Sequence, residues 1–125
     1  MRLFIAKSYD CQRNFDCILA GDACMGGDMP KSAFSSHSQA QVAAKTVLAE
    51  LFGEPQPQAG YFNTCWSLID TDDSVKIGGS YIPTPEKIKE ESRFISKMED
   101  TPETRRTNFE DSAAWYAGLT RELFS

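Results

Sequence analysis

The sequence predicts an α+β domain: one strand, a long amphipathic helix, a small antiparallel sheet of two to three strands and a C-terminal helix. Three observations lead to this prediction. An apolar run ends at a Gly–Asp pair at residue 21, an apolar stripe of helical period fills residues 40–51, and aromatic and β-branched residues dominate from residue 61. A chain of 125 residues supplies enough apolar surface for one modest core.

The first predicted element is a strand over Phe15–Ala20, followed by a Gly-rich loop over Gly21–Ser35. Residues Met1–Asn14 before it carry little regular pattern. A strand that ends in Gly21-Asp22 brings a carboxylate to the edge of a sheet, where cofactors bind in α/β proteins. The dipeptide by itself is common, and its ordinary interpretation is a turn-forming Asp after Gly.

The clearest helix is predicted over residues 37–52. Ser36, with Gln39 three residues later, forms a possible capping box, and Gly53 followed by Pro55 provides the stop signal. One continuous apolar stripe runs along this helix: Ala40, Ala43, Ala44, Val47, Leu48 and Leu51.

A β-hairpin is predicted next. Tyr61–Asp70 forms its first strand, Thr71–Ser74 its turn, and the alternating residues Val75, Ile77 and Tyr81 mark its second strand. The charged segment Glu86–Met98 allows either an exposed helix or a short third strand.

A last helix is predicted to begin at Thr107, with Glu110 three residues later. Its apolar period predicts an inner face made of Phe109, Ala113, Tyr116, Ala117, Thr120, Leu123 and Phe124.

Composition excludes several classes of function. A net charge of −5 disfavours nucleic acid or an anionic membrane as a partner. No apolar stretch approaches the ~20 residues that span a bilayer. The segment Met1–Lys7 is too short in apolar residues for a signal-peptide core, so the residues themselves predict a soluble, cytoplasmic chain.

The cysteines give no metal-site pattern. Cys11, Cys17, Cys24 and Cys65 form no C-x-x-C pair, and the single histidine, His37, does not complete a zinc site. We therefore predict no metal site, and we expect Cys11 and Cys17 to be buried or idle thiols.

Five short motifs occur in a specific order: Gly21-Asp-Ala23, Met29-Pro-Lys-Ser32, Ser38-Gln39, Asn63-Thr-Cys-Trp-Ser67 and Trp115-Tyr-Ala-Gly118. In this order they resemble the C-terminal part of the flavoprotein subunit of flavocytochrome c sulfide dehydrogenase. The resemblance predicts one flavin-binding and interface domain over residues 15–125, with residues 1–14 unmatched. Members of that family are about three times longer and begin with a dinucleotide-binding unit, whose G-x-G-x-x-G turn is not found here.

The resemblance implies a cofactor and the residues that bind it. The strand that ends at residue 20 would come from an FAD domain, and Glu86–Met98 would be a strand. The FAD-contacting residues would be Gly21, Asp22, Lys31, Ser32, Ser38, Gln39 and Trp115.

Each of these residues also has an ordinary structural interpretation. Asp22 would accept a hydrogen bond from a ribityl hydroxyl, and otherwise it forms a turn. Lys31, Ser32 and the Ser38-Gln39 turn would lie against the N1 and C2 edge of the flavin, where a helix N-terminus stabilises negative charge, and otherwise they cap a helix. Trp115 would pack beside the ring, and otherwise it packs in the core.

Cys65 matches the cysteine that forms half of a redox-active disulfide in the resembling family. That disulfide accepts attack by hydrosulfide, and disulfide exchange requires two sulfurs in bonding geometry. Its partner lies in the N-terminal portion of family members, and none of the other three cysteines matches it. The alternative is a structural cysteine buried in a strand.

The resemblance therefore implies FAD-dependent oxidation of hydrosulfide, with electrons passed to a c-type cytochrome in the complete enzyme. For the chain by itself we expect no independent activity. The alternatives are a non-enzymatic interaction or dimerisation module, which would form a homo-oligomer, and one half of a split flavoenzyme that needs the dinucleotide-binding portion as its partner. Family resemblance predicts a periplasmic location, whereas the residues predict a cytoplasmic one.

Overall fold

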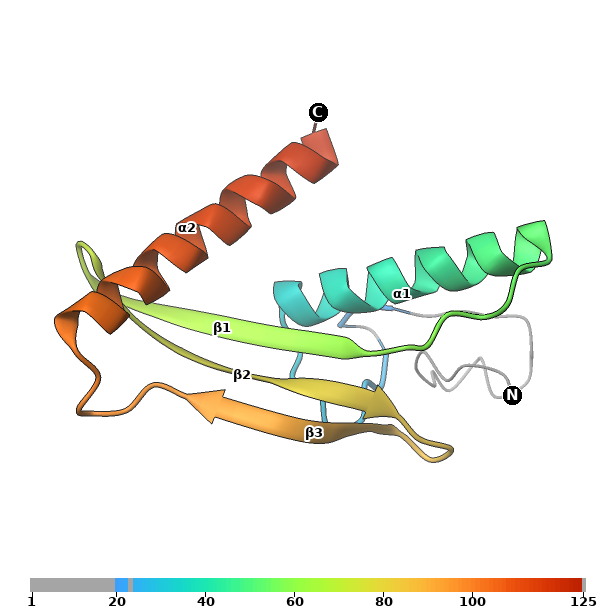
Figure 1. The fold of residues 1–125 in the computed structure, drawn as a ribbon, viewed down its shortest axis with the longest axis horizontal. Coiled ribbons are helices and arrows are strands. Elements are labelled where there is room, and N and C mark those ends of the chain that lie inside the picture. Colours follow the sequence, from blue (N-terminus) through green and yellow to red (C-terminus); the bar gives the residue numbers. More distant parts are fainter. Residues whose placement is uncertain (1–19, 23, 125) are drawn as a thin grey trace. The chain divides into compact units, whose positions relative to one another are not determined.

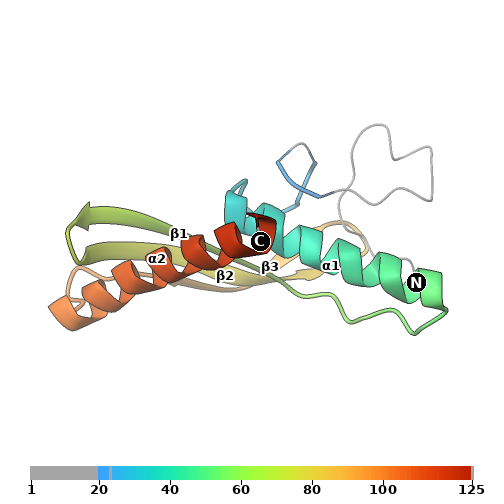
Figure 2. The same cartoon turned by 90° about the horizontal axis from the view of Figure 1, so that it is seen from above.

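A computed structural model describes residues 20–22 and 24–124. These contain two helices and one antiparallel sheet, namely α1 (Ala33–Phe52), β1 (Tyr61–Asp70), β2 (Asp73–Pro83), β3 (Ile88–Ile95) and α2 (Pro102–Phe124). The strands lie side by side in the order β1-β2-β3 (Figure 1 and Figure 2). The predicted α+β class is confirmed, and the third strand is confirmed with it. Apart from Ala20, the strand predicted over residues 15–20 lies outside the described residues, as do Cys11 and Cys17.

The chain divides into two compact units. The first contains the described residues up to Thr64 together with Gly78–Arg93, and the second contains Cys65–Ile77 together with the residues from Phe94 onward. The first unit therefore holds the loop of residues 20–32, α1 and one end of the sheet. The second unit holds the hairpin between β1 and β2, the end of β3 and α2.

Helix α1 begins four residues before the predicted start, and the predicted Ser36–Gln39 capping box is wrong. Ser32 is the N-cap, because its hydroxyl accepts a hydrogen bond from the Ser35 N–H at 3.0 Å. The predicted end is confirmed. Gly53 adopts a left-handed conformation with φ 66°, and the Glu54 N–H donates to the Ala49 carbonyl at 2.8 Å, a Schellman arrangement.

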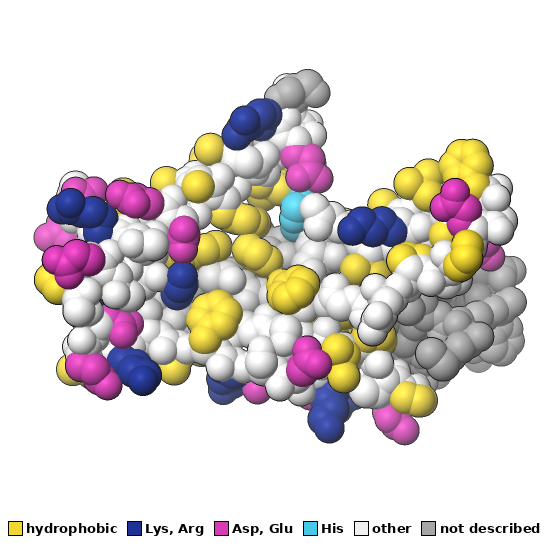
Figure 3. All heavy atoms as spheres, viewed as in Figure 1, with side chains coloured by type: hydrophobic (Ala, Val, Ile, Leu, Met, Phe, Trp, Pro, Cys, Tyr) yellow, Lys and Arg dark blue, Asp and Glu magenta, His cyan; other side chains and the backbone are white. Residues whose placement is uncertain are grey.

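The apolar stripe of α1 points away from the interior. The buried residues of this helix are Ser35, Ser38, Gln39, Thr46 and Ala49, and four of these five are polar. Leu51 and Phe52 are 74% and 73% exposed, and Figure 3 shows hydrophobic side chains at the surface over the end of α1. A surface helix normally turns its apolar stripe toward the core. Here the hydrogen-bond partners offered by β1 and the loop select the opposite face.

The core of the first unit is small and aromatic. Its buried residues are Met29, Ala59, Tyr61, Tyr81 and Ile88, with Val42 of α1 packed against them. Tyr61 and Tyr81 come from neighbouring strands, so the sheet contributes most of this cluster and the loop contributes Met29. Of the three residues whose alternation predicted β2, Tyr81 is buried, Val75 is half-buried and Ile77 is 40% exposed, so the strand is confirmed but the alternation does not mark one buried face.

Helix α2 begins at Pro102, five residues before the predicted start at Thr107. The Thr101 carbonyl accepts a hydrogen bond from the Arg105 N–H at 3.0 Å, and the Thr101 hydroxyl accepts one from the Thr104 N–H at 3.3 Å. Proline favours the first helical position, because its fixed φ suits a helix and its missing N–H would have no partner there. The Thr101-Pro102 pair is therefore the true start signal.

The predicted inner face of α2 is wrong. Asn108 is the buried residue of this helix, whereas Tyr116, Leu123 and Phe124 are 69%, 62% and 82% exposed. The residues that turn inward sit on the neighbouring stripe, which carries Arg105, Asn108 and Trp115. Polar anchoring, rather than apolar burial, fixes the rotation of α2 within its unit.

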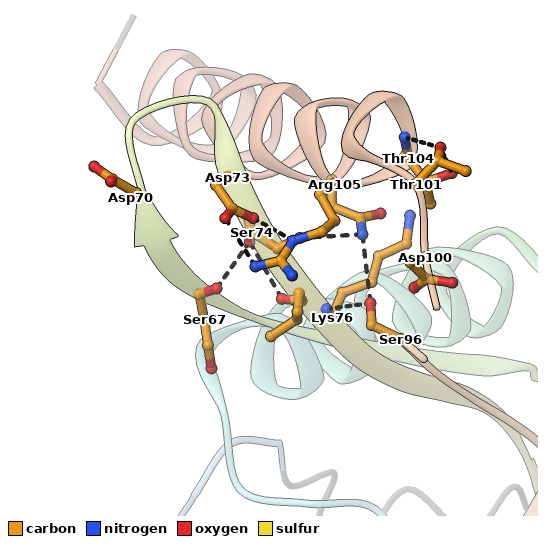
Figure 4. A network of polar contacts seen from close by, with 12 residues as sticks. Ser67, Asp70, Asp73, Ser74, Lys76, Ser96, Asp100, Thr101, Thr104 and Arg105 are labelled. Atoms are coloured by element: carbon orange, nitrogen blue, oxygen red, sulfur yellow. Dashed lines mark hydrogen bonds and ion pairs between the residues drawn. The ribbon is translucent and has the colours of Figure 1, made fainter. Parts of the chain in front are cut away.

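A polar network joins α2 to the hairpin (Figure 4). The Arg105 guanidinium donates two parallel hydrogen bonds to the Asp73 carboxylate, at 2.5 and 2.8 Å. The Asn108 side-chain amide donates to the Ser74 carbonyl at 3.3 Å and to the Ser96 hydroxyl at 3.4 Å. The Ser96 hydroxyl also accepts the Lys76 N–H at 2.9 Å, so a single serine links β2, the residues after β3 and α2.

Replacement of Asn108 should destabilise the second unit. Asn108→Ala leaves the buried Ser74 carbonyl without this donor, and we expect the free energy of unfolding to fall by about 1–3 kcal/mol. Both tryptophans of the chain, Trp66 and Trp115, belong to this unit, so urea unfolding followed by tryptophan fluorescence measures the change. Glu110→Ala, on the exposed side of α2, is the control and should change stability by less than about 0.5 kcal/mol. Equal effects of the two substitutions would contradict the anchoring role.

Candidate functional site

The first unit contains a pocket of about 420 Å³, within the range of about 300–1,000 Å³ that is usual for small-molecule sites. Three segments form it: the Gly-rich loop, the first turns of α1 and the start of β3. The lining residues are Gly21, Asp22, Cys24, Met25, Gly26, Gly27, Met29, Pro30, Lys31, Ser35, Gln39, Glu86, Lys87 and Ile88. Of the predicted cofactor-binding residues, Gly21, Asp22, Lys31 and Gln39 are thus brought together in one pocket.

Gln39 joins the loop to α1. Its side-chain oxygen accepts the Gly21 N–H at 2.9 Å and the Cys24 thiol at 3.7 Å. Its side-chain nitrogen donates to the Met29 sulfur at 3.6 Å. Gln39 is itself buried, so it shapes the inner wall of the pocket from a position that the loop covers.

Cys24 lies inside the pocket wall and is 4% exposed. Its thiol donates to the Gly21 carbonyl at 2.7 Å. Burial raises the pKa of the Cys24 thiol, against a smaller lowering by a backbone hydrogen bond and by the charge of Lys31. The thiol is therefore protonated at neutral pH, which makes it a hydrogen-bond donor in the loop and a poor nucleophile.

The start of α1 is held by Asn63 of β1. The Asn63 side-chain oxygen accepts hydrogen bonds from the Ser32 hydroxyl at 2.6 Å and the Ser35 hydroxyl at 3.0 Å. The Ser38 hydroxyl accepts the Phe62 N–H at 3.0 Å. Ser32 and Ser38 therefore dock α1 on the strand. Sequence reasoning quoted Asn63 only as part of a motif, because no local signal shows which distant serines an asparagine will contact.

The rim of the pocket carries opposite charges. Asp22 is exposed, and one of its oxygens accepts the Ser36 hydroxyl at 3.1 Å. Lys31 is exposed, and within the described part of the chain its ammonium forms no ion pair. The first turn of α1 contains no acidic residue of its own, so Asp22 of the loop is the carboxylate shown in contact with this end of the helix. This rim suits a ligand with hydroxyl groups and an anionic edge.

The second unit holds the remaining predicted site residues, Cys65 and Trp115. Cys65 is half-buried on β1 and lines a second pocket of about 320 Å³. The lining of that pocket contains apolar residues and three basic residues, namely Lys76, Lys97 and Arg105. Lys76 is paired with Asp111 at 3.1 Å and Arg105 is paired with Asp73, so Lys97 is the basic residue of this pocket without an ion pair among the described residues.

Trp115 packs against Trp66. The ring centroids are 6.0 Å apart with an angle of 34° between the planes, in the range of favourable aromatic pairs. The structure therefore packs Trp115 of α2 against the hairpin, at the residue that follows Cys65 in the sequence.

The described residues form neither a cluster of metal ligands nor a membrane-spanning helix. In residues 20–22 and 24–124, no three His, Cys, Asp or Glu side chains lie close enough to hold a metal ion together. Neither α1 nor α2 is apolar enough to cross a bilayer, and this statement covers the same residues.

A comparison with protein families matches residues 57–124 to the model of the flavocytochrome c sulphide dehydrogenase, flavin-binding family. The chain belongs to this family. The matched region covers β1, β2, β3 and α2, and it includes Cys65 and Trp115. Membership in a flavin-binding family agrees with FAD as the predicted cofactor, and the flavocytochrome in its name agrees with a cytochrome partner.

The pocket of the first unit combines apolar and charged surface. Met25, Met29 and Ile88 provide apolar surface, while Asp22 and Lys31 provide an acceptor and a positive charge at the rim. Gly26 lies so close to Gln39 that an added Cβ would come within 3.2 Å of the Gln39 side-chain nitrogen. The loop backbone at Gly26 therefore packs closely against the Gln39 side chain.

Tyr61, in the core beside the pocket loop, should titrate at unusually high pH. Burial raises its pKa to about 12 from the ordinary 10.0. Between these values the unfolded chain ionises Tyr61 and the folded chain does not. The stability that this group contributes is therefore fully present below pH 10 and is lost as the pH rises toward 12. Ultraviolet titration at 295 nm should show a late-titrating component that decreases by one tyrosine in Tyr61→Phe. Titration of all tyrosines near pH 10 in the folded protein would contradict this assignment.

Proposed function

We propose that the chain is the flavin-binding C-terminal part of an FAD-dependent sulfide dehydrogenase, which oxidises hydrosulfide and passes electrons through FAD to a c-type cytochrome. The observation that carries the proposal is the family match over residues 57–124. The pocket of the first unit supports it independently, because its rim and walls suit part of a flavin.

The roles of the rim residues follow from their chemistry. The Asp22 carboxylate would accept hydrogen bonds from ribityl hydroxyls, since two oxygens offer more acceptor sites than the Ser36 hydroxyl occupies. The Lys31 ammonium and the start of α1 would stabilise negative charge at the N1 and C2 edge of the ring. Gly21, Ser32, Ser38 and Gln39 would hold this arrangement in place through the hydrogen bonds that fix the loop and α1.

In this proposal Cys65 forms a disulfide with a cysteine of the dinucleotide-binding part of the flavoprotein. Hydrosulfide attacks this disulfide, so that its S–S bond breaks, a persulfide forms on one cysteine and the other cysteine leaves as a thiolate. Trp115 packs beside the flavin ring. FAD, when bound, supplies the two-electron acceptance that sulfide oxidation requires. Cys65 borders a pocket large enough for a small sulfur anion, and Lys97 gives that pocket a positive charge. That charge would attract the hydrosulfide anion to the pocket.

A second candidate function is association with another protein. The end of α1 presents Val47, Leu48, Leu51 and Phe52 to solvent, and contiguous apolar surface of this kind marks interaction sites. The partners that we propose are the dinucleotide-binding part of the flavoprotein, a c-type cytochrome, or a second copy of this chain.

Removal of the Asp22 carboxylate should weaken flavin binding. A hydrogen bond to a charged group is worth about 1.5–3 kcal/mol, so Asp22→Ala should raise the Kd for FAD roughly 10- to 100-fold. Quenching of FAD fluorescence and the visible spectrum of the flavin measure this in the purified chain. Glu50→Ala is the control, because it removes one exposed carboxylate from α1 outside the pocket. Binding that is equally strong in both variants would remove Asp22 from the site, and no binding by the unaltered chain would refute a flavin site in this part of the protein.

The apolar end of α1 should govern association. We expect Leu48→Gln with Leu51→Gln to reduce self-association or binding of the c-type cytochrome, measured by light scattering and by ultracentrifugation. The control is Lys45→Gln, an exposed polar change on the same helix. An unaltered mass distribution in the double variant would show that this surface is not an interface.

A further inference from the structure

We propose that Asp28 is a positioning residue of the flavin pocket, which clamps the Gly-rich loop to the start of β3 and so fixes the width of the pocket. This inference rests on the proposed flavin function. The pocket has walls from two segments far apart in the sequence, residues 21–31 and residues 86–88. Its width therefore depends on what holds these two segments together.

Asp28 makes three contacts with the segment that carries the second wall. Its backbone N–H donates to the Ile88 carbonyl at 2.9 Å. One carboxylate oxygen pairs with the Lys87 ammonium at 2.6 Å, and the other accepts the Glu90 N–H at 3.3 Å. The backbone and the side chain of Asp28 thus contact three residues: Lys87, which precedes β3, and Ile88 and Glu90 within it.

Gly27 allows this approach. Its φ of +64° lies in the left-handed region, and a Cβ there would collide with the Ile88 carbonyl and approach the Ile88 nitrogen to 2.8 Å. Ile88 belongs to the buried core, so the loop is attached to a part of β3 that cannot shift freely. The glycine lets the loop touch the strand, and the aspartate holds it there.

The charge of the clamp persists at neutral pH. The Lys87 ammonium, followed by the Glu90 N–H, lowers the pKa of Asp28 below its ordinary 3.8. Lys87 also lines the pocket. Its ion pair with Asp28 therefore fixes the position of the Lys87 ammonium relative to a bound ligand. By contrast, Lys31 across the pocket has no such anchor among the described residues.

Cys24 offers a readout that needs no flavin. Its thiol lies in the same loop, nearly buried, and it should become accessible if the loop leaves β3. We compare the rate at which iodoacetamide alkylates Cys24, mapped by mass spectrometry, with the rate for Cys65, which belongs to the other unit and serves as an internal reference. FAD titration on the same proteins measures the effect on binding.

Four variants of the full chain test the clamp. Asp28→Asn and Lys87→Met remove the ion pair, and we expect each to raise the Cys24 rate and the Kd for FAD by about 3- to 5-fold. Lys87→Arg keeps a cation and should restore both values to within about twofold of the unaltered chain. Arg93→Met breaks a surface ion pair with Glu90 in the same unit outside the pocket lining, and it should change neither value.

The outcomes separate the inference from the proposed function. Unchanged Cys24 and FAD values in Asp28→Asn and Lys87→Met would overturn the inference while leaving the flavin site standing. Equal weakening by Lys87→Arg and Lys87→Met would also overturn it, because the ion pair would then not be the cause. If the unaltered chain binds no FAD, the proposed function is overturned. The positioning role of Asp28 in a flavin pocket is then overturned too, even if the substitutions raise the alkylation rate of Cys24.

Discussion

The buried polar face of α1 is the constraint on which the first unit depends. Ser35, Ser38 and Gln39 are buried, and buried polar groups need partners because each unsatisfied one costs about 1–3 kcal/mol. Asn63 and the Phe62 N–H on β1 satisfy the serines, and the loop satisfies Gln39. Hydrogen bonds are directional and these partners have set positions on β1 and the loop. They therefore allow a smaller range of helix rotation than non-directional apolar contacts would. The Thr46 hydroxyl, buried further along, is an exception with no hydrogen-bond partner among the described residues.

Two consequences follow from this orientation. The first turns of α1 border the pocket, because Gln39 and Ser35 line it from beneath the loop. The apolar stripe of the helix is left on the surface toward its C-terminal end, where Leu51 and Phe52 are largely exposed. One helix therefore supports the candidate cofactor site with its polar side and carries the candidate association surface on its other side.

The second unit relies on a comparable arrangement. Helix α2 is attached by the Arg105–Asp73 pair, by the Asn108 amide and by the contact of Trp66 with Trp115. A bidentate arginine–carboxylate pair specifies geometry as well as energy. The motif tryptophans thus have a structural function within this unit. In both units polar contacts set the orientation of the helix, and apolar contact comes from the core around Tyr61 in the first unit and from the Trp66–Trp115 pair in the second.

The sequence by itself determined the elements whose signals are local. Strand β1 has its predicted bounds, because aromatic and β-branched residues mark Tyr61–Asp70, and the helix end at Gly53 follows from a single residue that tolerates positive φ. The ordered motifs also led to the family, which the match over residues 57–124 establishes. Tertiary structure decided the rest. Four serines lie near the start of α1, and each could serve as its N-cap by sequence. Ser32 is the N-cap in the structure, where its hydroxyl also donates a hydrogen bond to the Asn63 side chain. The inward faces of both helices and the grip of Asp28 on Lys87 likewise depend on partners more than 20 residues away, which periodicity along one helix cannot reveal.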